Sequence, residues 1–95
     1  MLKITTFEEN KSRRLKLEGK LKEAWVLELE QCWRELDGEK KLVIDLTDVD
    51  FVDTAGKYLL ALMYGRGARF TADSPTMKHL VAKLVATSKR LAYTS

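Results

Sequence analysis

The segment VDFVDTAGKYLL, residues 49–60, decides the expected architecture of this chain. Its first four residues are mostly apolar and β-branched, which is typical of a strand. From Ala55 onward the apolar residues recur with helical spacing. The strand therefore passes into a helix through residues 53–56, Asp-Thr-Ala-Gly. The hydroxyl of Thr54 at this junction is either a helix cap or a group that accepts a phosphate.

Two further strands and a helix are expected before this junction. Residues 2–8 contain β-branched residues in loose alternation, and residues 15–21 alternate leucine with charged residues, so these segments predict a hairpin. Residues 22–36 carry apolar residues on one helical face, including both tryptophans, of which Trp33 is expected in the core. Residues 41–46 are almost continuously apolar, which is typical of a central parallel strand covered on both faces.

One more strand between two helices is expected after the junction. Residues 55–64 are apolar nearly all round, so we expect this helix to be largely buried. Residues 69–72 predict a short strand. Ser74 and Pro75 are typical of a helix start, with serine as the N-cap and proline in the first turn. Residues 87–95 are expected to form a frayed tail.

The resulting element order is β-β-α-β-α-β-α within residues 1–95. Strands that alternate with helices imply right-handed crossovers and a mostly parallel sheet, to which the hairpin adds an antiparallel strand. A chain of 95 residues suits one domain. We therefore expect a single small α/β domain with a mixed, mostly parallel four-stranded sheet and packed helices.

The composition is that of a globular protein, with 45% hydrophobic and 33% charged residues. No apolar run is long enough to span a bilayer, and the N-terminus lacks the layout of a signal peptide, so we expect no membrane insertion. A single cysteine fits a reducing, cytoplasmic setting. Cys32 is the only cysteine, which excludes an intramolecular disulfide and a cysteine metal cluster. No metal and no cofactor are expected.

Charge is distributed unevenly along the chain, whose net charge is +3. Residues 56–95 carry seven lysines and arginines against one acid, Asp73, whereas residues 1–55 carry an acidic excess. The basic C-terminal surface is either solvated without a partner or steers an acidic one. No helix-turn-helix and no aromatic RNA-binding motif accompanies it, so we expect no nucleic acid partner.

Two motifs in the chain are similar to those of a known family. The strand end LEGKL, residues 17–21, precedes an amphipathic helix, and LVIDLTDVDFVDTAG follows at residues 42–56. Together they resemble the STAS domain, the sulphate-transporter and anti-sigma-factor-antagonist family, over residues 15–84. The junction of strand, Asp, hydroxyl residue, any residue, Gly and helix is the most specific part. The resemblance implies the STAS fold and a protein-interaction module that is not an enzyme.

The resemblance also implies a phosphorylation switch at the junction. In stand-alone STAS antagonists it usually reads Asp-Ser-Ser-Gly or Asp-Ser-Thr-Gly, and a partner kinase that is also the anti-sigma factor phosphorylates the first hydroxyl. The unphosphorylated domain binds this kinase and frees the sigma factor. Thr54 matches the phospho-acceptor position and Asp53 the acid before it. The expected function is therefore an anti-sigma-factor antagonist, or a similar partner-switching regulator of transcription.

Three positions differ from the family pattern. Ala55 replaces the second hydroxyl, Lys22 stands where an acid often follows the Gly-x-Leu strand end, and Lys57 replaces an aliphatic residue. Thr54 is thus interpreted either as a phospho-acceptor or as a plain N-cap, and Gly56 as a place where a partner's backbone approaches. The candidate docking residues are Lys22, Asp53, Thr54, Ala55, Gly56 and Lys57.

Two other classes of function compete with this one. Small STAS proteins also resemble accessory subunits of ABC-type lipid transport complexes, so a transporter ATPase is the alternative partner to a serine-kinase-like anti-sigma factor. An enzyme is disfavoured because His79 and Cys32 lie on different predicted helices with no catalytic partner. The four aspartates of residues 45–53 lack the spacing of a calcium loop, and Asp45 and Asp53 are expected to accept hydrogen bonds from backbone donors.

Overall fold

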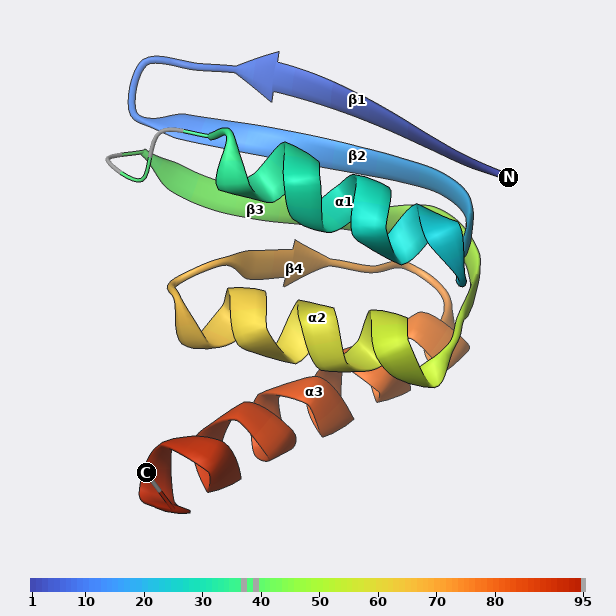
Figure 1. Ribbon diagram of the computed structural model, residues 1–95, viewed down its shortest axis with the longest axis vertical. Coiled ribbons are helices and arrows are strands. Elements are labelled where there is room, and N and C mark those ends of the chain that lie inside the picture. Colours follow the sequence, from blue (N-terminus) through green and yellow to red (C-terminus); the bar gives the residue numbers. More distant parts are fainter. Residues whose placement is uncertain (37, 39, 95) are drawn as a thin grey trace.

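Three helices pack on a four-stranded sheet in the predicted order, β-β-α-β-α-β-α (Figure 1). The computed structural model describes residues 1–36, 38 and 40–94, with side chains described up to Lys89. The strands are β1 (Leu2–Glu8), β2 (Ser12–Leu21), β3 (Lys41–Val52) and β4 (Arg69–Thr71). The helices are α1 (Ala24–Arg34), α2 (Thr54–Gly65) and α3 (Pro75–Thr94).

The strand order in the sheet is β1-β2-β3-β4. β1 and β2 form an antiparallel hairpin, whereas β2, β3 and β4 run parallel. The register of β2 and β3 aligns Ser12 with Lys41 at one end and Leu21 with Val52 at the other. The mixed, mostly parallel sheet predicted from the sequence is thus confirmed, and the carboxyl ends of β2 and β3 lie side by side.

The glycine of the LEGKL motif is needed where β1 begins. Gly19 has φ 110°, a conformation that L-residues with a side chain rarely adopt. A Cβ at this position would also overlap the carbonyl oxygen of Met1. The amide of Lys20 donates a hydrogen bond to that same oxygen at 3.1 Å. Gly19 therefore lets the first residues of the chain lie directly against β2.

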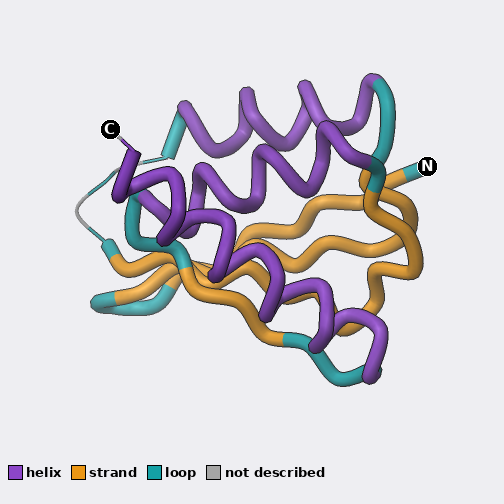
Figure 2. Tube along the Cα trace, turned by 90° about the horizontal axis from the view of Figure 1, so that it is seen from below, coloured by secondary structure: helices purple, strands orange, loops and turns teal. Residues whose placement is uncertain are grey.

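Both parallel crossovers place their helices on one face of the sheet. The steps from β2 to β3 through α1 and from β3 to β4 through α2 run in the same direction across the sheet. Two right-handed connections in one direction put both helices on the same side, as Figure 2 shows. The prediction that the central strand is covered on both faces is therefore wrong.

The uncovered face of β2 and β3 carries cross-strand ion pairs. The Nζ atom of Lys16 lies 3.2 Å from the Asp48 carboxylate, and that of Lys20 lies 3.3 Å from the Asp50 carboxylate. Lys16 and Lys20 alternate along β2 with the buried leucines that face the helices, as the two-residue period of a strand requires. This charged face remains solvated, which antiparallel and mixed sheets tolerate.

The apolar core lies between the covered face of the sheet and the helices. Its fully buried side chains come from β2, α1, β3 and α2: Leu15, Leu17, Leu21, Leu29, Ile44, Leu46, Leu60 and Met63. Trp33 packs against this core, as predicted, and so does Trp25. Removing this surface from water is the main favourable contribution to folding.

The last helix begins as predicted and extends into the segment for which a frayed tail is predicted. Pro75 is the first residue of α3, and the Ser74 hydroxyl accepts a hydrogen bond from the Met77 amide at 3.1 Å. The sequence predicts fraying from residue 87, whereas α3 is helical to Thr94. Ser88 is buried and lies close to Gly65 of α2, so the start of this segment is packed; residue 95 lies outside the described residues, and fraying stays a prediction.

Candidate functional site

The candidate site lies where the carboxyl ends of the parallel strands meet the amino ends of the helices. β2 ends at Leu21 and β3 at Val52, and each chain then turns directly into a helix. Figure 1 shows the starts of α1, α2 and α3 at this end of the sheet. In open α/β sheets, ligands bind outside the carboxyl ends of the strands. Topology therefore places the DTAG segment at the end of the fold best suited to binding.

Asp53 is the N-cap of α2. Its Oδ1 atom accepts a hydrogen bond from the Gly56 amide at 2.8 Å, and its backbone is extended. Thr54 is the first residue of the helix, so the interpretation of Thr54 as the cap is wrong. Aspartate accepts from the free amides of the first turn, as cap residues do, and its charge favours the positive end of the helix.

The same carboxylate also holds the start of α1. The other oxygen of Asp53, Oδ2, accepts a hydrogen bond from the backbone amide of Glu23 at 2.9 Å. The Asp53 amide in turn donates to the carbonyl oxygen of Leu21 at 3.0 Å. One side chain thereby ties together two helix starts that lie thirty residues apart in the sequence. The expectation that Asp53 accepts from backbone donors is confirmed.

Glu23 has an unusual backbone conformation at this contact. Its φ is 54° and its ψ is −130°, and it is the only non-glycine residue with positive φ in the described part of the chain. Such conformations cost about 1–3 kcal/mol and persist only where the surroundings hold them. Here the hydrogen bond to Asp53 holds the Glu23 amide.

These bonds set the charge state of the junction. The amide of Glu23 first, and then that of Gly56, lower the pKa of the Asp53 carboxyl below its usual range. Burial opposes this shift, and the nearby positive charge of Lys22 supports it. Lys22 is half-buried in the turn between β2 and α1, and its positive charge acts as a counter-charge to the Asp53 carboxylate. Asp53 is accordingly a carboxylate at neutral pH.

Thr54 and Ala55 are the exposed residues of this junction. Within the described part of the chain, the Thr54 hydroxyl makes no hydrogen bond. The cap position is already filled by Asp53, so the hydroxyl is not needed to satisfy the helix. A free hydroxyl on a fixed helix start is accessible to a modifying enzyme.

Gly56 serves the interior of the domain, and the interpretation of Gly56 as a surface for a partner's backbone is wrong. It is buried in the first turn of α2. A Cβ there would lie 2.9 Å from the Val52 Cγ1 atom and 3.0 Å from the carbonyl oxygen of Leu21. Both contacts are closer than a carbon atom accepts without movement. Glycine at this position lets α2 pack onto the ends of β2 and β3.

An exposed apolar face on α2 extends the candidate surface beyond the residues predicted from sequence. The side chains of Tyr58 and Leu62 are 58% and 42% exposed. They lie one and two helical turns after Thr54, and therefore on its side of the helix. The prediction that this helix is largely buried is wrong for this face. Helical periodicity did not reveal it because apolar residues occupy every face of the segment.

The remaining chemically active side chains do not gather at this site. His79 is exposed on α3, and Cys32 is half-buried on α1, where burial raises the pKa of its thiol. Oδ1 of Asp45 accepts hydrogen bonds from the amide and hydroxyl of Thr47, at 3.0 and 2.7 Å, as expected of a strand aspartate. Over the described residues, no group of three potential ligands that could hold a metal ion occurs. None of the described helices has the length and apolar character of a membrane span.

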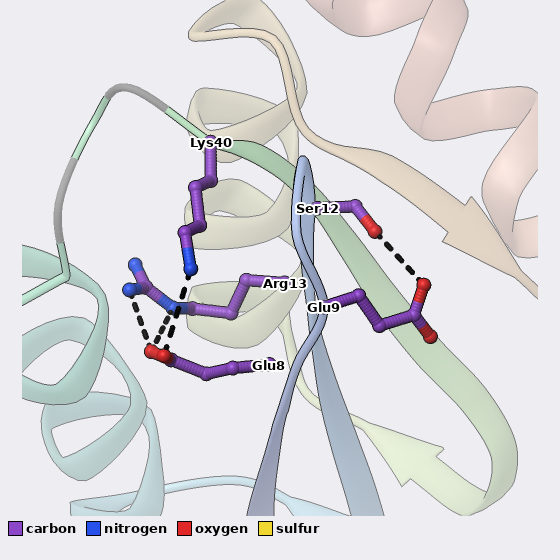
Figure 3. Close-up of polar contacts among 5 residues, drawn as sticks. All are labelled: Glu8, Glu9, Ser12, Arg13 and Lys40. Carbon is purple, nitrogen blue, oxygen red and sulfur yellow. Dashed lines mark hydrogen bonds and ion pairs between the residues drawn. The ribbon is translucent and has the colours of Figure 1, made fainter.

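The opposite end of the sheet is held by a different kind of contact (Figure 3). The guanidinium of Arg13, whose side chain is almost fully buried, binds the Glu8 carboxylate, with Nε 2.8 Å from Oε1. Lys40 lies 3.6 Å from the other oxygen of Glu8, and the Ser12 hydroxyl donates to Glu9 at 3.2 Å. This cluster links the β1–β2 turn to the start of β3.

The overall fold has counterparts among solved structures. No family model matches the chain, and no curated protein matches its sequence. A crystal structure described as that of Mglu superposes with a TM-score of 0.61 at 21% identity, over 75% of this chain. The present chain spans only 19% of that protein.

A second structure decides the type of fold. It is the crystal structure of an antisigma-factor antagonist, a STAS domain from Rhodobacter sphaeroides, with a TM-score of 0.53 and 19% identity. The match covers 75% of this chain and 84% of that domain. The fold is that of a STAS domain. The resemblance noted in the sequence is thus confirmed for the fold. The DTAG junction, residues 53–56, joins β3 to α2 of this fold.

Proposed function

We propose that this STAS-type domain is a non-enzymatic partner-switching module, an anti-sigma-factor antagonist or a close functional equivalent. It docks its partner through the exposed part of the β3–α2 junction and the adjoining face of α2. The observation that carries the proposal is the free, exposed hydroxyl of Thr54 on a helix start that Asp53 holds in place. The partner is a serine-kinase-like anti-sigma factor, which would place the protein in the cytoplasm.

The cap contact of Asp53 determines how a phosphate on Thr54 would act. A phosphate adds nearly two negative charges and three acceptor oxygens at neutral pH. The Gly56 amide is already bound by Asp53, and the Lys57 amide is bound by the Asp53 carbonyl at 2.9 Å. A phosphate on Thr54 would therefore stay on the surface beside a carboxylate, where it changes docking without refolding the domain.

A second function is favoured by the exposed apolar face of α2. Tyr58 and Leu62 offer a docking surface that needs no phosphate, and Ala55 removes the second hydroxyl of the usual motif. Both features suit a permanent subunit contact. The partner would then be a transporter ATPase, and the protein an accessory subunit of an ABC-type lipid transport complex.

Affinity capture with three forms of the protein tests the proposal. Wild type, Thr54→Glu and Thr54→Val are used as baits in extract of the native cell, with and without ATP. The proposal predicts a kinase-like partner that binds wild type and Thr54→Val but not Thr54→Glu. Mass spectrometry after incubation with ATP should find the phosphate on Thr54 of wild type. Equal capture of an ATPase by all three forms would favour the transport subunit and contradict the switch.

A further inference from the structure

A groove runs beside the junction, between α2 and α3. Its first part, of about 290 Å³, lies among the end of β3, Lys57 of α2 and the first half of α3. Its second part, of about 250 Å³, continues along α2 and α3 past Thr54 and Tyr58. Lys57, Leu80 and Lys83 line both parts. The two hollows are therefore one surface groove with Thr54 on its rim.

The groove combines an apolar floor with basic walls. Phe51, 44% exposed, and the half-buried Leu80 supply apolar surface. Lys57 and Lys83 are exposed, and neither forms an ion pair within the described part of the chain. Asp50 is the one acid among the described residues that line it, and its carboxylate already lies 3.3 Å from Lys20. The groove thus offers unneutralised positive charge to an occupant.

The shape of the groove suits an elongated occupant. Its wall on α3 extends from Thr76 to Thr87, which is about 16 Å at the rise of an α-helix. That length matches three turns of a partner helix. Small-molecule sites instead bury most of the ligand in an enclosed cavity. A helix laid in a groove places apolar residues of one face on the floor and its flanking residues against the walls.

We infer that this groove binds an acidic amphipathic helix of a partner protein, with Lys57 and Lys83 pairing to its flanking carboxylates. The inference deepens the proposed function, because it rests on docking at this end of α2 and names the chemistry of the docked element. A phosphate on Thr54 would stand on the same rim and repel the acidic helix. In this arrangement Lys57, which replaces the aliphatic residue of the family pattern, binds a carboxylate of the partner helix.

A synthetic peptide tests the groove directly. The probe is a labelled helix of about 18 residues, five turns long, with leucine and phenylalanine on one face and glutamate on its flanks. Binding is followed by fluorescence anisotropy and by amide chemical shifts of the protein. We expect Lys57→Glu and Lys83→Glu together to weaken binding about tenfold or more, with shifts confined to α2, α3 and the end of β3. Lys78→Glu is the matched control, since Lys78 is exposed on α3 outside the groove, and should change binding less than about twofold.

Each other result overturns the inference. A probe that does not bind, that binds equally to the double variant, or that is weakened as much by Lys78→Glu excludes a groove site. So does equal binding of a probe with lysine in place of glutamate, or binding only to vesicles of anionic lipid. Circular dichroism confirms that each variant is folded.

The two proposals fail separately. If the probe binds as expected but Thr54→Glu leaves its affinity unchanged, the groove stands and the charge switch is lost. If Thr54→Glu releases the native partner while the double lysine variant retains it, the switch stands and the groove is not the docking site.

Discussion

The two ends of the parallel strands are held by different means. At the carboxyl end, Asp53 binds backbone amides of two helix starts, and Thr54 is left free. At the amino end, Glu8 and Arg13 bind each other through their side chains, and Lys40 joins them. A carboxylate that accepts hydrogen bonds from backbone amides holds the path of the chain and involves no other side chain. Paired side chains fix one another and offer less to a partner.

This difference indicates which end has exposed side chains that make no structural contact. At the carboxyl end, the contacts are made by the half-buried Asp53 carboxylate and backbone amides, so the side chains of Thr54 and Ala55 can change without loss of those contacts. At the amino end, the charged side chains are themselves the contacts. Substitutions at the two ends should therefore differ in size and in their dependence on pH and salt.

The largest loss of stability is expected for a substitution at Gly56, at the carboxyl end, with Gly38 at the amino end as its comparison. Gly56→Ala adds a methyl group against Val52 and Leu21, whereas Gly38→Ala meets no atom within 4 Å. Overpacking costs about 1–3 kcal/mol, of which better helix propensity returns up to about 1 kcal/mol. We expect Gly56→Ala to lose about 1–2 kcal/mol and Gly38→Ala to stay within about 0.5 kcal/mol in urea unfolding. Equal effects would contradict the packing assigned to Gly56.

The loss of the Asp53 carboxylate should come next. Asp53→Ala leaves two amides without their acceptor and should lower the melting temperature by about 5 °C, the usual size of a lost cap in a domain of this length. Asp53→Asn keeps one oxygen and should recover part of this loss. Amide exchange checks the cause, because Glu23 and Gly56 should lose protection together.

Asp53 should also link stability to pH. Its pKa is lowered in the folded protein, so its contribution is present above the usual aspartate value of about 3.9 and is lost as the pH falls through the folded value. Wild type should therefore lose more stability than Asp53→Asn on acidification from pH 5 to about pH 2. Parallel curves for the two proteins would argue against the amide contacts as the source of the shift.

Relief of the strained backbone should have a smaller effect of opposite sign. Glu23→Gly removes the side chain that disfavours φ 54°, while it also makes the unfolded chain more flexible. We expect a net gain of about 0.5–1 kcal/mol in the free energy of unfolding. Glu23→Ala, which keeps a Cβ, is the control and should show no gain. A destabilised Glu23→Gly would mean that the conformation is not strained.

The smallest effect is expected at the amino end. Glu8→Gln removes the charge that Arg13 and Lys40 share, and the difference from wild type should shrink at about 1 M salt because the Glu8 carboxylate is exposed, although its partner Arg13 is buried and is screened less. Glu9→Gln, whose partner is only the Ser12 hydroxyl, is the control and should show no salt dependence. A change at Glu8 as large as that at Asp53 would erase the distinction between the ends.

Local sequence patterns predicted most of the fold. Alternation in β2, helical spacing in α1 and the Ser74–Pro75 start of α3 each depend on neighbours in sequence, and each is confirmed. The covered and open faces of β3 were not predictable, because they depend on the direction of both crossovers. The exposed apolar face of α2 was not predicted, because apolar residues occupy all sides of this helix.

The position of the DTAG junction between β3 and α2 was predicted from sequence, but the contacts within the junction were not. The DTAG junction is where the motif put it, and Thr54 is exposed. The bond between Asp53 and the Glu23 amide joins residues thirty positions apart, and no local pattern reports such a contact. The assignments of Thr54 as cap and Gly56 as surface were wrong for the same reason. Both depend on which atoms of β2 and α1 lie nearby.

The close approach of Met1 to β2 has a practical consequence for work with this protein. The Met1 carbonyl oxygen accepts a hydrogen bond from the Lys20 amide, two residues before Lys22, so the amino terminus lies near the end of β2 and the proposed docking surface. Figure 1 shows the other terminus at the far end of the sheet. A purification tag or a surface-tethering linker fused ahead of Met1 would crowd the junction. The same fusion placed after α3 leaves it open, so orientation on a biosensor chip should decide whether binding is seen.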